Sequence, residues 1–244
     1  HGGLRNRFIT LANLESAAPE AIRSGNERVI RPRLSDADFF YRADRAKRLD
    51  SRLAGLDSMM YEKRLGSLGD KTRRIVSLAA TLASACGADS ALAGRAAELS
   101  RCDLLSDLVG EFPELQGTMG SYYAAADGEA GEVSVAIGEF YQPRFSGDAI
   151  PATEVGRAVA LADKLDSLVG IFGIGSAPTG DRDPFALRRA AIGLLRIIIE
   201  SDIALDLRDA IDFSLATYAG VKLAPDTAEQ VYGFVRERLR GYYL

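Results

Sequence analysis

Histidine is almost absent from this sequence: the only one among 244 residues is His1, and there is no tryptophan. Imidazole is the side chain most often used as a general base and as a ligand for transition metals. Its absence beyond the first residue removes most routes to nucleophilic catalysis and to transition-metal hydrolysis. The sequence also lacks a GxSxG nucleophile turn. We therefore expect no catalytic residue and no bound metal in this chain.

Cysteine is scarce as well, since the chain has only Cys86 and Cys102. Both lie in apolar helical contexts, which predicts buried free thiols; a disulfide or a metal site is the alternative. No apolar run approaches the length of about 18 residues that a membrane helix needs, and the first residues lack the apolar centre of a signal peptide. Composition therefore favours a cytoplasmic protein without a membrane partner.

The net charge is −4, which argues against a protein that coats nucleic acid generally. A local basic face is still compatible with this charge, because electrostatic attraction depends on how charges are distributed. The basic residues gather in five short groups. These are residues 28–33, 42–48, 73–74, 188–189 and 236–240. Each group alone is typical of a solvated helix surface, but five in one chain favour at least one functional patch.

The spacing of apolar residues predicts a mainly α-helical protein whose start is irregular and contains a strand. Residues 7–14, RFITLANL, alternate between apolar and polar side chains, which predicts a β-strand. Turn-forming residues and a short helix follow, and residues 35–54 are expected to form a helix with Ser35 as its cap.

Longer helices are expected to carry the chemistry. They are predicted over residues 70–86 with Gly87 as the stop, over 90–109, and from Thr153 as cap through Val169. A further helix is expected to open at Asp183, with Asp183 as N-cap and Pro184 in the first helical position.

Between residues 170 and 180 the sequence GIFGIGSAPTG is rich in glycine. It has neither the GxxxxGK[ST] nor the GxGxxG spacing, so it does not indicate a nucleotide loop. Flexible backbone before a helix N-terminus nevertheless favours an anion, and Arg182, Arg188 and Arg189 lie nearby to neutralise one. A structural loop that crosses the core is the alternative.

Acidic residues recur in pairs at helical spacing. Asp103 with Asp107, and Asp163 with Asp166, are each expected to share one helix face. Two such helices side by side could hold a divalent cation through carboxylates. Solvated or capping carboxylates are the ordinary interpretation.

Several segments of the chain resemble the β subunit of bacterial heterotetrameric glycyl-tRNA synthetase. Those that carry the resemblance best include KRLGSLGDKTRRI (63–75), CDLLSDLVGEFPELQGTMGSYYA (102–124), ALADKLDSLVGIFGIG (160–175) and PTGDRDPFALRRAAIGLLRI (178–197). The resemblance implies that a separate α subunit, using ATP and Mg²⁺, activates and transfers glycine, while the β subunit mainly binds tRNA. This chain would be an internal part of β.

The resemblance also implies a domain division. Residues 1–34 would end a preceding domain as strand plus loop, residues 35–200 would form a multi-helical bundle similar to HD domains, and residues 201–244 would lead into an anticodon-binding domain outside the chain. HD-domain phosphohydrolases bind metal through a histidine, a His-Asp dipeptide and a later aspartate. Here Cys102-Asp103 stands at the dipeptide, Lys71 or Asp70 at the first histidine, and Asp163 at the last aspartate. Both imidazole ligands are therefore missing.

Together these observations predict a non-catalytic, tRNA-binding part of a cytoplasmic glycine–tRNA ligase. Its partners would be glycine tRNA and the α subunit of a heterotetramer, with no DNA, no membrane and no cofactor bound by this chain. The candidate tRNA contacts are Arg182, Arg188, Arg189, Arg144 and Lys71. An active HD-type phosphohydrolase, disfavoured by the missing histidines, and a purely structural spacer are the alternatives.

Overall fold

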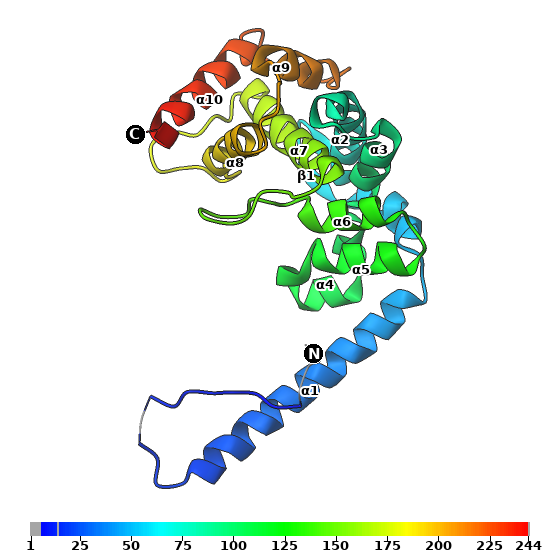
Figure 1. Cartoon of the computed structure of the whole chain (residues 1–244), viewed down its shortest axis with the longest axis vertical. Helices are drawn as coiled ribbons and strands as arrows, with labels where there is room; N and C mark the ends of the chain where they lie inside the picture. The colour runs from blue at the N-terminus through cyan, green and yellow to red at the C-terminus, as the bar shows by residue number, and fades with distance from the viewer. Residues whose placement is uncertain (1–5, 14, 244) are drawn as a thin grey trace. The chain divides into compact units, whose positions relative to one another are not determined.

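The computed structural model describes residues 6–13 and 15–243, and most of them lie in α-helices (Figure 1). The only sheet within these ranges is an antiparallel ribbon of β1 (Met60–Glu62) and β2 (Gly66–Ser67). The prediction of a mainly α-helical chain is confirmed. The chain divides into two compact units, His1–Arg42 and Ala43–Leu244. Within the described ranges, no helix combines the length and apolar character that a membrane crossing requires.

The long first helix, α1 (Pro19–Arg45), corrects two predictions. Residues 7–13 form no strand, and residue 14 of the predicted strand lies outside the described residues. The helix begins at Pro19 instead of after Ser35, because a proline in the first position and Glu20 in the first turn both favour a helix start. It continues through Pro32.

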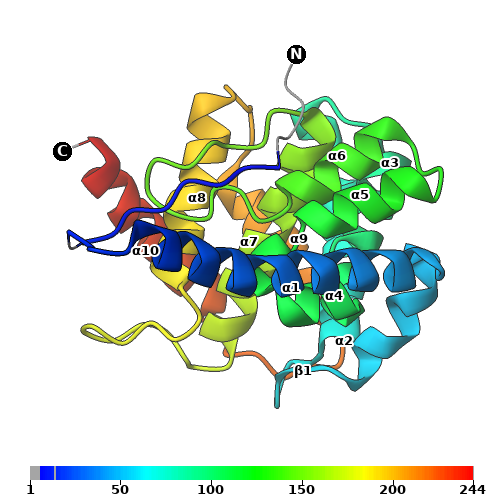
Figure 2. The same ribbon diagram turned by 90° about the horizontal axis from the view of Figure 1, so that it is seen from below.

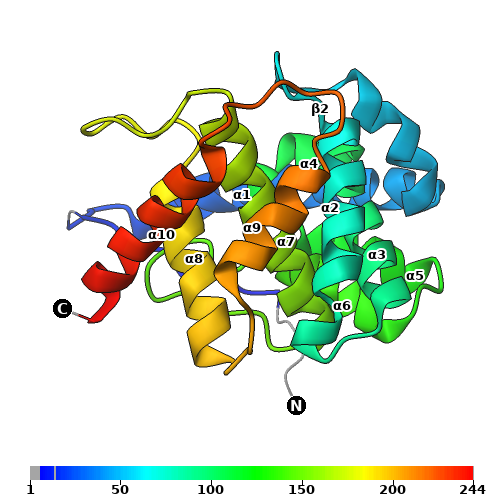
Figure 3. The ribbon, with the colours of Figure 1, turned by 90° about the horizontal axis from the view of Figure 1, so that it is seen from above.

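The second unit is built around α7 (Glu154–Gly173), most of whose residues are buried. A helix that is apolar on nearly all sides must be surrounded by other elements. α7 contacts α2, α3 and α6 as well as α8, α9 and α10 (Figure 3). These neighbours are α2 (Leu68–Leu82), α3 (Ser90–Leu99), α6 (Gly131–Glu139), α8 (Leu187–Glu200), α9 (Leu207–Ala216) and α10 (Thr227–Tyr243). Thr153 caps α7 as predicted, its hydroxyl accepting a hydrogen bond from the Gly156 amide at 3.0 Å.

The remaining elements are short and lie between the long helices. They are η1 (Leu49–Ser58), η2 (Ser84–Cys86), η3 (Cys102–Leu105), α4 (Asp107–Glu111), η4 (Pro113–Leu115) and α5 (Thr118–Ala126). α5 lies beside α6, which in turn lies beside α3 (Figure 2). The helix predicted over residues 70–86 is α2 followed by η2, and Gly87 stops it in the left-handed region, with φ 73°.

The helix predicted over residues 90–109 is wrong, because α3 ends at Leu99 and is followed by η3 and α4. This break in the helix lets the carboxylate of Asp103 accept hydrogen bonds from the Gly117 and Gly120 amides. Asp103 is consequently buried whereas Asp107 is exposed. The two carboxylates therefore do not share a helix face.

The start of α8 also differs from the prediction. The helix begins at Leu187, after Ala186 in the left-handed region with φ 54°, and Pro184 precedes it. Asp183 still satisfies the first free amides, since its carboxylate accepts from Leu187 N at 2.8 Å and Arg188 N at 2.9 Å.

Candidate functional site

A buried ion cluster lies between α2 and α7. Asp166 is fully buried on α7, and its carboxylate accepts from Lys71 Nζ at 2.8 Å and Arg74 Nε at 2.7 Å, both on α2. Asp163, one turn earlier, pairs with Arg101 and lies 3.3 Å from Lys71 Nζ. These five residues, Lys71, Arg74, Arg101, Asp163 and Asp166, are called the buried ion cluster below.

The buried ion cluster carries an excess of positive charge. Burial alone would raise the pKa of Asp163, but the charges of Lys71 and Arg101 outweigh it and hold that pKa below its usual value. The pKa of Lys71 is raised in turn, because Asp166 and Asp163 outweigh the effect of burial. Three cations therefore face two carboxylates, and all of them are ionised at neutral pH.

Aromatic rings complete the surroundings of the two arginines. The Arg101 guanidinium lies over the Phe140 ring, 4.5 Å from its centroid, and the Arg74 guanidinium lies over Tyr218 at 4.4 Å. Cations over aromatic faces are stabilised electrostatically, most strongly where water is excluded. The rings and Asp163 therefore fix Arg101 in the core.

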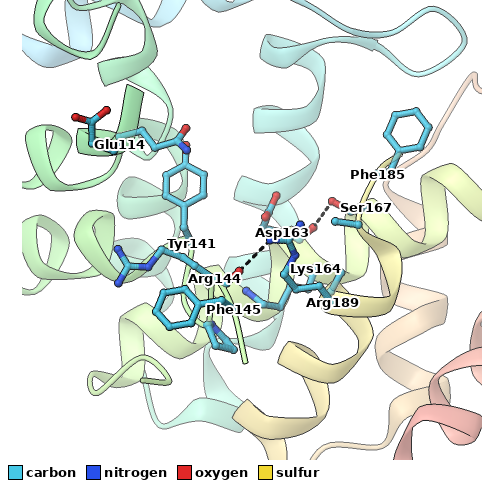
Figure 4. Close-up of a pocket in the computed structure, with 13 residues that line it drawn as sticks. Glu114, Tyr141, Arg144, Phe145, Asp163, Lys164, Ser167, Phe185 and Arg189 are labelled. Atoms are coloured by element: carbon cyan, nitrogen blue, oxygen red, sulfur yellow. Dashed lines mark hydrogen bonds between the residues drawn. The ribbon is translucent and has the colours of Figure 1, made fainter. Parts of the chain in front are cut away.

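A cavity of about 590 Å³ opens beside Asp163 (Figure 4). Its walls come from η4, from the segment between α6 and α7, from α7 itself and from the start of α8. The lining residues are Glu114, Gln116, Tyr141, Pro143, Arg144, Phe145, Asp163, Lys164, Ser167, Phe185, Ala186, Arg189 and Ala190. In Figure 4, Tyr141, Arg144 and Phe145 lie on one side and Phe185 on the other, with Asp163, Lys164 and Arg189 between them.

Lys164 is a buried cation in this lining, with 6% of its surface exposed. Its ammonium donates to the backbone carbonyl of Gln142 at 2.7 Å, and it has no carboxylate partner within ion-pair distance among the described residues. Burial lowers the pKa of Lys164 to about 8, opposed only in part by Asp163. Gly193 on α8 makes room for this side chain, because a Cβ at that position would lie 2.8 Å from Lys164 Cε.

Two arginines lie at the mouth of the cavity. Arg144 pairs with Asp148 through its Nε at 2.9 Å, and this pairing lowers the pKa of Asp148 to about 2. Arg189 is exposed and donates from Nη1 to the Arg144 carbonyl at 3.1 Å, as the dashed line in Figure 4 shows. Across the described part of the chain, no carboxylate lies within ion-pair distance of Arg189.

The structure brings together three of the residues singled out from the sequence, since Arg144, Arg189 and Asp163 line the same cavity. Arg182 and Arg188 lie outside this lining; Arg182 is exposed, and Arg188 donates to the Gly180 carbonyl. The surroundings of Lys71 do not favour the tRNA contact that the sequence predicts for it. Only 3% of Lys71 is exposed, and its ammonium is held by Asp163 and Asp166.

Two of the positions that resemble HD-domain ligands meet as an ion pair, since Lys71 Nζ lies 3.3 Å from Asp163. The other two are engaged elsewhere: the Cys102 thiol donates weakly to the Glu98 carbonyl, and Asp103 accepts from the Gly117 and Gly120 amides. Over the ranges that the structure describes, no three His, Cys, Asp or Glu side chains are grouped as metal ligands would be. Both thiols are free and buried as predicted, and burial raises their pKa to about 11 for Cys86 and about 12 for Cys102.

Sequence reasoning missed Lys164, Arg101 and the aromatic residues of the cavity. A signal for Lys164 exists, because it is a lysine next to Leu165 in a helix whose residues from 158 to 162 are all apolar. Arg101 gives no such signal, since an arginine within a predicted helix is ordinarily solvated.

Comparisons with known proteins give the same family throughout. The family model described as "Glycyl-tRNA synthetase beta subunit" matches residues 1–244. The chain is 50% identical over 241 residues to the "Glycine--tRNA ligase beta subunit" of Ralstonia nicotianae and 51% identical over 242 residues to that of Ectopseudomonas mendocina. It is 48% identical over 241 residues to that of Chromohalobacter salexigens. Each alignment covers 99% of this chain and 35% of the relative.

The class that these matches define is that of the aminoacyl-tRNA synthetases. Within it, the chain belongs to the glycyl-tRNA synthetase beta subunit family. It spans 35% of the length of the curated relatives it matches.

Proposed function

We propose that this chain is a tRNA-contacting part of a cytoplasmic glycine–tRNA ligase. In this proposal, a separate alpha subunit attaches glycine to tRNA with ATP and Mg²⁺, within a heterotetramer. The present chain binds neither cofactor and supplies affinity and position for the tRNA. Membership of the beta subunit family supports this assignment.

The observation that carries the proposal is the exposed Arg189 beside Arg144 at the mouth of a positively charged cavity. A guanidinium without a carboxylate partner is free to bind phosphate oxygens, often through two parallel hydrogen bonds. Such contacts fix the orientation of a nucleic acid and depend strongly on salt, but they read little sequence. Arg182, in the loop before α8, and Arg188, in the first turn of α8, extend the basic surface.

The HD-like fold is part of the same proposal. The resemblance places a metal ligand at Asp163, yet here that carboxylate pairs with Arg101 and lies 3.3 Å from Lys71 Nζ. A guanidinium and an ammonium therefore hold the oxygen atoms that a metal would need, and the residues do not fit a metal centre. This arrangement favours a binding role over a metal-dependent phosphohydrolase.

The test is tRNA binding by the complete two-subunit synthetase carrying Arg189→Glu, measured across a salt series. We expect weaker binding of glycine tRNA and a slope of log K against log salt that falls by about one. Arg208→Glu is the matched control, because Arg208 lies on α9, outside the cavity lining, and pairs with Glu229. Equal affinity of the Arg189→Glu and unmodified enzymes would contradict the proposal and favour a structural spacer.

A further inference from the structure

We propose that the cavity between α7 and α8 binds one unpaired nucleotide, with its phosphate at Lys164 and Arg189 and its base against Phe145. The nucleotide is either a free mononucleotide or an unpaired nucleotide of tRNA, and in the second form the inference rests on the proposed function. Three observations carry it: a buried cation without a counter-ion, a neutralised back wall, and exposed aromatic side chains at the mouth.

The first observation is Lys164. A buried ammonium is costly unless it is paired, and it has three N–H donors to satisfy. The interaction that the structure provides is one hydrogen bond to the neutral carbonyl of Gln142. Because Lys164 lines the cavity, an anion there would supply the missing charge, and Arg189 on the facing helix would bind the same anion.

The second observation is the back wall. A carboxylate such as Asp163 would ordinarily repel a phosphate. Here Arg101 and Lys71 neutralise the negative charge of Asp163. The buried ion cluster as a whole carries more cations than carboxylates. The other carboxylate in the lining, Glu114, is exposed at the rim, where water screens it.

The third observation is the size and the aromatic content of the cavity. About 590 Å³ is within the range of sites for small organic ligands and exceeds the needs of a bare phosphate. Phe145 is 59% exposed directly beside Arg144, and Tyr141 and Phe185 line the same space. An exposed ring is a surface on which a base stacks. A base in a duplex already stacks on its neighbours, so the proposal requires an unpaired one.

The experiment titrates the full chain alone with adenosine 5′-monophosphate, so that the ATP site of an alpha subunit cannot interfere. We expect adenosine alone and inorganic phosphate alone to bind at least about tenfold more weakly, since each lacks one half of the contacts. Lys164→Met should weaken the monophosphate at least about tenfold. Lys222→Met, at an exposed lysine outside the lining, should leave it unchanged.

Two further variants separate the halves of the site. Phe145→Ala should weaken the monophosphate but not inorganic phosphate, because only the base contacts the ring. Gly193→Ala presses on the Lys164 side chain and should weaken both, which provides a second test if Lys164→Met does not fold. Failure of the unmodified chain to bind the monophosphate, equal binding by Lys164→Met and wild type, or stronger competition by a blunt RNA duplex than by a single-stranded oligonucleotide would each overturn the proposal.

The source of the nucleotide follows from tRNA binding by the complete synthetase. Weaker tRNA binding by Lys164→Met supports a nucleotide of tRNA, whereas unchanged tRNA binding with lost monophosphate binding supports a free nucleotide. The Arg189→Glu salt series tests the proposed function separately. Lost tRNA affinity in that series, together with no monophosphate binding by the unmodified chain, would leave the proposed function standing and the nucleotide site refuted.

Discussion

Asp166 neutralises two of the buried cations between α2 and α7. It is the carboxylate that Lys71 and Arg74 share, and no part of it is exposed. Removing one partner from a buried ion pair leaves an uncompensated charge, which costs far more than the pair itself contributes. The integrity of the second unit should therefore be more sensitive to Asp166 than to carboxylates in surface pairs.

We accordingly expect Asp166→Asn to lower the free energy of unfolding by about 3–5 kcal/mol. Urea unfolding of the variant and the wild type at neutral pH measures this difference. Glu229→Gln breaks the exposed pair with Arg208 and should leave stability unchanged. Equal losses in the free energy of unfolding would show that the buried pairs of Asp166 contribute no more to stability than an exposed pair.

Asp103 provides a test of pH dependence. Burial raises its pKa to about 6, although the Gly117 and Gly120 amides act in the opposite direction. An unfolded aspartate titrates near pH 3.9, so the folded chain binds a proton that the unfolded chain does not across the interval between these values. This group therefore costs stability above the folded pKa, and that cost is relieved as the pH falls through it.

Asp103→Asn removes this titration. Between about pH 7.5 and about pH 5, the wild type should gain roughly 1 kcal/mol of stability relative to the variant. Urea unfolding of both proteins at several pH values measures the difference. Stability profiles that run parallel over this interval would mean that Asp103 keeps an ordinary pKa.

Among the helices, α7 and α3 make opposite use of glycine. A Cβ at Gly170 in α7 would lie 2.2 Å from Tyr218 Oη and 3.0 Å from Leu65 Cδ1, so the glycine permits close packing. At Gly94 in α3 the nearest atom would be Val76 Cγ1 at 3.9 Å, an ordinary contact. The same substitution should therefore change stability in opposite directions in the two helices.

Gly170→Ala should cost about 1–3 kcal/mol, because the added methyl group displaces a buried tyrosine. Gly94→Ala should stabilise by up to about 1 kcal/mol, because alanine restricts the unfolded chain and favours helix. Thermal unfolding of the two variants beside the wild type measures both signs. A destabilised Gly94→Ala protein would contradict the assignment of open space at that position.

The sequence was sufficient to predict α7, because a threonine cap and a long apolar stretch are local features. The division of residues 90–109 into α3, η3 and α4 was not predictable in this way. Its causes are distant in the sequence: Arg101 turns into the core to reach Asp163, and Asp103 reaches Gly117 and Gly120. Local helix propensity does not indicate which distant residues Arg101 and Asp103 contact.

Over the whole molecule, the same limit applies to the candidate site. Arg144 and Arg189 were predicted from their basic character, and Asp163 from its helical spacing to Asp166 and from the resemblance. The burial of Lys71 was not predictable, because its partner Asp166 lies 95 residues further along the chain. The cavity itself depends on four separate stretches between residues 114 and 190, which only the tertiary fold brings together. Its local positive charge is likewise hidden by a net charge of −4.

The two thiols have a practical consequence for spectroscopy. A thiol reacts with maleimide reagents as the thiolate, and both Cys86 and Cys102 are buried with a raised pKa. Neither will compete for label near neutral pH. A single cysteine introduced at the exposed Ser146, next to Phe145 of the cavity lining, would therefore carry a fluorophore selectively. The native cysteines therefore need not be replaced before the chain is labelled for fluorescence.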